Sequence, residues 1–129
     1  MKTEDDYIDY KLEKAQQSLE AAELLFNNNF FADSLSKIYY AVFYAVSAWL
    51  TKKKLNPKTH QGVKSLFHKE FIYTGNVSKE QGEFFDMLQA KRFEVDYEDY
   101  PFINEEKLPQ YLENAKALIA LIKTRIKNS

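Results

Sequence analysis

The segment from 35 to 50, LSKIYYAVFYAVSAWL, constrains the fold more than any other part of the chain. If it is read as a helix that begins near Asp33, its apolar residues cover almost the whole circumference. A helix that is apolar on most sides is stable in water only when other elements surround it. The segment is therefore predicted to be the central helix of the fold.

The flanking sequence predicts further helices, because apolar residues recur at spacings of three and four. The first helix spans 8–26, and its apolar positions are Ile8, Leu12, Ala15, Leu19, Ala22 and Phe26. A shorter helix begins at Thr59, or at the Asn56–Pro57 pair, and ends near Phe71. No β-type alternation and no internal repeat interrupts this pattern.

Two more helices follow the YTGN sequence at 73–76. Ser78 and Gln81 form a capping-box pattern, and it opens a helix whose apolar stripe includes Arg92. Asn104 is a candidate cap for the last helix, and Pro109 delays its regular part. The prediction is an all-α fold: an antiparallel up-and-down four-helix bundle with a short additional helix.

Composition places limits on the class of protein. With 129 residues, three glycines, three prolines and 45% apolar residues, we expect a single helical domain over 1–129. There is no cysteine, which excludes disulfides and thiolate sites. The acidic start MKTEDDY is no signal peptide, and the run AVFYAVSAWL is too short to cross a bilayer, so we expect a cytoplasmic protein without a membrane partner.

The charges are divided between two blocks, although the net charge is only −1. Lys52 to Lys69 contains six lysines and no acid, and Glu94 to Glu106 contains six acids and no base. Opposed surface patches are the expectation. No cofactor and no metal is expected, because neither His60 nor His68 follows a glutamate at the spacing of di-iron bundles and no glycine-rich phosphate loop occurs.

Arg92 is the most informative candidate residue. A guanidinium in an apolar stripe costs several kcal/mol if it is unpaired, so it needs a partner or an opening. Asp96, one turn later, is the nearest candidate partner, and Tyr97 or Asp99 are others. Such a cluster is either a structural ion pair or a site.

The central helix offers two further candidates. Its aromatic residues Tyr39, Tyr40, Phe43, Tyr44 and Trp49 could stack on unpaired bases, but at helical spacing most of them are expected to be core. Lys37 and Tyr40 are exceptions, because their polar groups must reach water, a partner or a site.

The sequence resembles HEPN domains, in particular the small stand-alone prokaryotic ones. The resemblance runs nearly end to end and lies in SKIYYAVFYAVSAWL, KTHQGVKSLFHKEF, KRFEVDYEDY and LENAKALIALIK, of which the middle two are the most specific. It implies a four-helix bundle that often forms homodimers. Some members of that family are metal-independent ribonucleases, some are toxins neutralised by a small nucleotidyltransferase, and others only bind.

The family's nuclease motif is an arginine, four to six residues of any type, and a histidine. Arg92 matches the arginine, but the histidine would fall at Tyr97, Glu98 or Asp99, and no histidine follows His68. A longer form of the motif adds a tyrosine, which a partner nucleotidyltransferase modifies in some pairs. That place is Asp99 here, between Tyr97 and Tyr100.

Without the histidine, ordinary ribonuclease activity is not expected, because loss of a general acid or base costs about 10²- to 10⁴-fold in rate. The first hypothesis is a module that binds a nucleotide, RNA or a partner protein through Arg92, Asp96, Tyr97, Lys37, Tyr40 and His60, plausibly as half of a toxin–antitoxin-like pair with a nucleotidyltransferase. The second is an active ribonuclease toxin in which Arg92 acts with Tyr97, Asp96 or His60. The third is a structural bundle whose charged patches mediate dimerisation. Whether the chain is an enzyme stays open at this stage.

Overall fold

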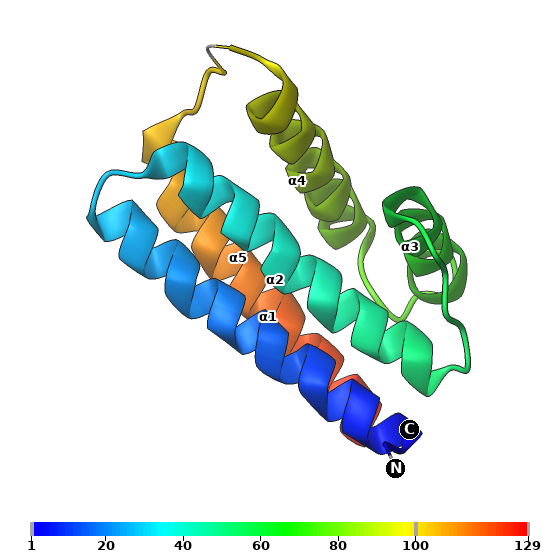
Figure 1. Ribbon diagram of the computed structural model, residues 1–129. Coiled ribbons are helices and arrows are strands. Elements are labelled where there is room, and N and C mark those ends of the chain that lie inside the picture. Colours follow the sequence, from blue (N-terminus) through cyan, green and yellow to red (C-terminus); the bar gives the residue numbers. More distant parts are fainter. Residues whose placement is uncertain (1, 100, 129) are drawn as a thin grey trace.

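The computed structural model describes residues 2–99 and 101–128. Their helices are α1 (Glu4–Asn27), α2 (Phe31–Lys52), α3 (His60–Phe67), α4 (Lys79–Tyr97) and α5 (Leu108–Lys127), with a π-helical turn at His68–Ile72 and a 3-10 turn at Glu105–Lys107. The four long helices alternate in direction along the chain, and α3 lies at the side of α2 and α4 (Figure 1). The all-α prediction, with four long helices and one short one, is confirmed.

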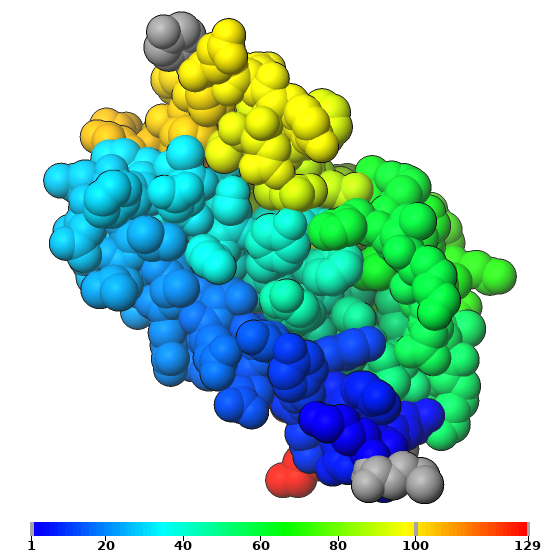
Figure 2. Space-filling view, viewed as in Figure 1, coloured from blue at the N-terminus to red at the C-terminus, as the bar shows by residue number. Residues whose placement is uncertain are grey.

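The central helix of the bundle is α2, as its sequence predicted. It contacts α1, α3, α4 and α5, and twelve of its residues are buried. Figure 2 shows one face of the molecule, where α3 and the C-terminal end of α4 lie against α2, with α1 beside them. The burial of α2 on several sides explains why a helix with so few polar residues is stable.

Local signals explain most of the helix boundaries. Thr59 and Ser78 cap α3 and α4 through their hydroxyls, which accept from the amides of Gly62 and Gln81. Asn104 caps the 3-10 turn, and α5 follows with Pro109 in its first turn, where the missing amide costs nothing.

The first and third helices differ from the bounds that the periodicity predicted. The first helix begins at Glu4 rather than near residue 8, because Thr3 and Asp6 form a reciprocal capping box. The third helix changes to a π turn at His68. There Gly82 of α4 approaches so closely that a Cβ on it would lie 2.9 Å from Cε1 of His68.

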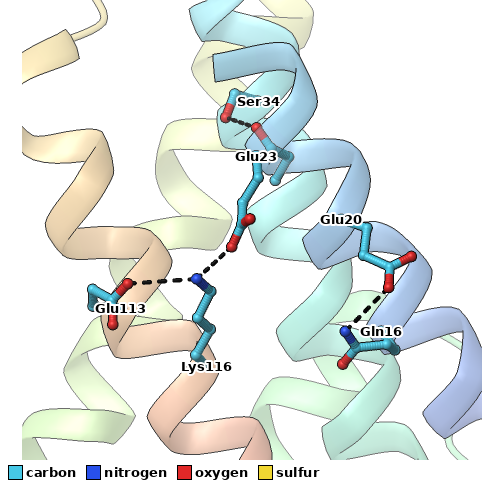
Figure 3. Close-up of polar contacts among 7 residues, drawn as sticks. Gln16, Glu20, Glu23, Ser34, Glu113 and Lys116 are labelled. Carbon is cyan, nitrogen blue, oxygen red and sulfur yellow. Dashed lines mark hydrogen bonds and ion pairs between the residues drawn. The ribbon is translucent and has the colours of Figure 1, made fainter. Parts of the chain in front are cut away.

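Polar contacts connect the long helices outside the apolar core (Figure 3). Lys116 of α5 bridges Glu23 of α1 and Glu113 of its own helix, and the buried Ser34 hydroxyl donates to the Ala22 carbonyl at 2.8 Å. These contacts fix α1 against α2 and α5. Across residues 2–99 and 101–128, no helix is both long and apolar enough to cross a bilayer.

Candidate functional site

The candidate site lies where α2, α3 and α4 meet, on the face seen in Figure 2. Its centre is the guanidinium of Arg92, whose Cζ lies 5.3 Å from the ring centre of Tyr40 and 5.7 Å from that of Tyr39. Periodicity explains this position, because Arg92 follows the buried Leu88 by one turn and so continues the inward stripe of α4 toward α2. The cation is thus held against two aromatic faces.

The ion pair of Arg92 leaves part of the guanidinium free. Nη2 lies 2.8 Å from Oδ2 of Asp96, which is the partner one turn later that the sequence indicated. Nε is buried and has no hydrogen-bond partner among residues 2–99 and 101–128. The Arg92 side chain is 23% exposed. The cation is therefore partly exposed, and an anion bound at that exposed part would add a second charge-assisted partner beside Asp96.

His60 enters the same junction from the first turn of α3. Its Nδ1 lies 2.7 Å from the Tyr39 hydroxyl, and its ring stacks on Phe43 at 4.5 Å between centres. The Thr59 cap fixes the start of the helix that carries His60. The hydrogen bond allows two tautomers: Nδ1 either accepts from the phenol or donates to it.

The environment keeps the two partners of this hydrogen bond uncharged at neutral pH. Burial lowers the pKa of His60, and the charge of Arg92 lowers it further. Burial also raises the pKa of Tyr39 above its ordinary value, although Arg92 opposes that shift. The cluster therefore pairs one permanent cation with a neutral imidazole and a neutral phenol.

Two sequence candidates lie beside the cluster. Tyr40 extends from beneath Arg92 into a groove of about 520 Å³ between α1 and α2, and Lys37 lines the same groove. Lys37 is exposed and Tyr40 is half-buried, as expected for residues whose polar groups reach water.

Tyr97 lies apart from the cluster. Its ring packs against Phe93 at 4.5 Å, and the side chain is 72% exposed at the end of α4. Tyr100, which flanks the motif position Asp99 on the other side, lies outside the described residues. Of the six sequence candidates, the structure thus brings together Arg92, Asp96, Tyr40 and His60, places Lys37 next to them, and leaves Tyr97 at the edge.

Sequence reasoning missed Tyr39 and Phe43 as parts of the site. Both were assigned to the core, and Tyr39 is indeed fully buried. Yet its hydroxyl is what orients His60. The available signal was that a buried tyrosine needs a hydrogen-bond partner, and only the tertiary structure shows which one.

The described residues contain no group of three or more histidine, aspartate or glutamate side chains that could hold a metal ion. The candidate site offers a cation for a phosphate, aromatic faces for a planar group, and a neutral imidazole that can accept or donate a proton.

Comparison with known proteins gives the family. The HEPN domain model matches residues 8–125. A Thermotoga maritima protein named "UPF0332 protein" is 33% identical over 99% of this chain and 97% of its own length. Two Methanocaldococcus jannaschii proteins bear the names "Putative toxin MJ0142" and "Putative toxin MJ0605". The first is 40% identical over 88% of this chain and 76% of its own, and the second 32% identical over 90% and 86%. The match covers most of each long helix, and the chain belongs to the HEPN domain family.

Proposed function

We propose that this HEPN protein binds single-stranded RNA or a nucleotide through its phosphate, with Arg92 as the cation, and that it lacks the family's ordinary ribonuclease activity. The observation that carries the proposal is the state of Arg92. The Arg92 side chain is partly exposed, and its guanidinium lies over two tyrosine rings. Among the described residues it has one carboxylate partner, and its buried Nε has no hydrogen-bond partner.

A purely structural role fits this geometry less well. An ion pair between residues four apart on one helix contributes only about 0.3–0.5 kcal/mol when it is partly exposed. An unsatisfied buried donor costs about 1–3 kcal/mol. The ion pair alone therefore explains little of why a charge stands at this place, and an oxyanion at the exposed part of the guanidinium would add a charge-assisted hydrogen bond.

Two relatives carry the word toxin in their names, so we propose a toxin–antitoxin-like setting. A nucleotidyltransferase as the partner protein and a homodimer as the working form are proposed from the membership of the HEPN family. The exposed Phe93 and Tyr97 rings, which pack on each other at the end of α4, are apolar enough to take part in either contact.

Binding of a fluorescein-labelled oligouridylate, measured by anisotropy, tests the role of Arg92. Arg92→Ala is expected to weaken binding about 10- to 100-fold, because a hydrogen bond to a charged group contributes about 1.5–3 kcal/mol. Arg125→Ala, which removes the only other arginine, is the matched control. Equal affinities for the two variants would refute the proposal. Unfolding of Arg92→Ala, seen by circular dichroism, would favour the structural reading instead.

A metal-independent ribonuclease is the second candidate, and His60 favours it. If Nδ1 donates to Tyr39, Nε2 is an unprotonated acceptor close to the Arg92 charge. His60 would then replace the histidine that the motif lacks. Incubation of a mixed RNA pool with the wild type in chelator decides between the candidates. Cleavage that both His60→Gln and Arg92→Ala abolish would establish the ribonuclease, whereas binding without cleavage supports the first proposal.

A further inference from the structure

The groove between α1 and α2 begins at the ring that Arg92 covers. Tyr40 has Arg92 over its ring and also lines the groove, so the two places share one side chain. The other lining residues are Lys14, Gln17, Ser18 and Ala21 from α1, and Lys37 and Tyr44, one turn before and one turn after Tyr40, from α2. The groove therefore adjoins the candidate site at Tyr40.

Both lysines of the groove are available to a ligand. In the part of the chain that the structure describes, neither Lys14 nor Lys37 forms an ion pair; the Lys14 ammonium instead lies 5.5 Å from the ring centre of Tyr10. Asp33 precedes Lys37 by one turn on α2 without bonding to it. Two unpaired cations on facing helices raise the local concentration of anions.

Neutral groups of the groove suit a nucleotide better than a bare anion. Tyr40 and Tyr44 are both half-buried, and their ring centres lie 6.3 Å apart. Ser18 is nine-tenths buried, and its hydroxyl forms no hydrogen bond with the rest of residues 2–99 and 101–128. Gln17 makes only a long 3.4 Å contact with Glu13. Aromatic faces next to cations and free polar groups are typical of surfaces that bind single-stranded nucleic acid.

We infer that this groove is a second subsite, which binds the nucleotides next to the one whose phosphate Arg92 holds. Lys14 and Lys37 contact successive phosphates, and Tyr40 and Tyr44 offer faces to the bases. The inference rests on the proposed function of Arg92 and deepens it: the ligand is a single-stranded RNA segment several nucleotides long, not a mononucleotide.

Oligonucleotides of two lengths can distinguish binding at Arg92 alone from binding that extends into the groove. The probes are fluorescein-labelled oligouridylates of three and of twelve nucleotides, and the test variant is Lys14→Gln with Lys37→Gln. Each phosphate contact on a single strand contributes about 0.7 to the slope of log K against log salt. Loss of both lysines should make that slope less steep by about 1.4 for the twelve-nucleotide probe. At 0.1 M salt this change corresponds to an affinity that is weaker by about 25-fold. Binding of the three-nucleotide probe should stay unchanged.

Lys123→Gln with Lys127→Gln is the matched control, because both of these lysines are exposed on α5. If the groove variant and this control bind the long probe equally, the inference is overturned, while Arg92→Ala still reports separately on the proposed function. If Arg92→Ala leaves both probes unaffected and only the groove variant weakens binding, the proposed function fails, and with it the continuous path from Arg92.

Discussion

Replacement of Tyr39 by phenylalanine isolates the one hydrogen bond that orients His60. The change removes the hydroxyl 2.7 Å from Nδ1 and keeps the ring that packs on Phe85 and lies beneath Arg92. A hydrogen bond of this kind contributes about 0.5–1.5 kcal/mol net, and a partner left unsatisfied in the interior costs about 1–3 kcal/mol. Because His60 is only half-buried, water can reach the freed nitrogen. The expected loss is therefore about 1 kcal/mol.

The expected change in melting temperature follows from this loss of stability and from the unfolding entropy of a chain of this size. Unfolding entropies of about 2.1 cal/mol/K per residue give about 0.27 kcal/mol/K for 129 residues. Tyr39→Phe should thus lower Tm by about 4 °C in differential scanning calorimetry. RNA affinity should change little, because a phenylalanine ring also attracts the guanidinium.

Tyr40→Phe is the matched control. Tyr40 is the next residue on the same helix and lies under the same guanidinium, but its hydroxyl bonds to none of the residues that the structure describes. Its Tm should stay within about 1 °C of the wild type, since surface-reaching hydroxyls contribute little. If Tyr39→Phe and Tyr40→Phe are equally stable, the hydrogen bond does not hold His60, and the reasoning about the site is wrong.

Two further measurements test the electrostatics and the packing. The folded state lowers the pKa of His60 below its ordinary value of 6.5, so the unfolded chain binds this proton more readily, and the free energy of unfolding should fall as pH drops below about 6.5. His60→Gln should remove that part of the slope in denaturant titrations between pH 7 and 5, and an unchanged slope would contradict the pKa shift. Ser34→Ala removes the buried bond to the Ala22 carbonyl and should cost about 1 kcal/mol, again about 4 °C in Tm. Ser36→Ala, at a partly exposed position two residues along the same helix, should cost much less, and equal losses would show that the buried bond contributes nothing.

Part of the candidate site could be predicted because it is local. Arg92 and Asp96 are one turn apart, so the helical period alone brings them together, and the structure shows their ion pair. The need for Lys37 and Tyr40 to reach polar surroundings follows in the same way from the segment 35–50, whose other residues are apolar, aromatic or serine. Neither argument needs to know which helix lies opposite.

The remaining contacts depend on how the helices cross. Tyr39 and His60 are 21 residues apart, on different helices, and their bond exists only because α3 packs with its first turn against α2. The spacing of apolar residues along the helix could not predict whether Tyr39 belongs to the core or to the site, because a buried ring can belong to both. The placement of Arg92 over two tyrosines likewise requires a particular register of α4 on α2.

The sequence by itself determined which segments are helical, which helix is central, where α3 and α4 are capped and that Arg92 needs a partner or an opening. These follow from periodicity, capping and the cost of a buried charge. The tertiary structure decided which neutral groups surround that charge and that a groove with two unpaired lysines begins at the same ring. Side chains from separate helices meet only after packing has fixed the helix crossings, and one-dimensional spacing does not contain that information.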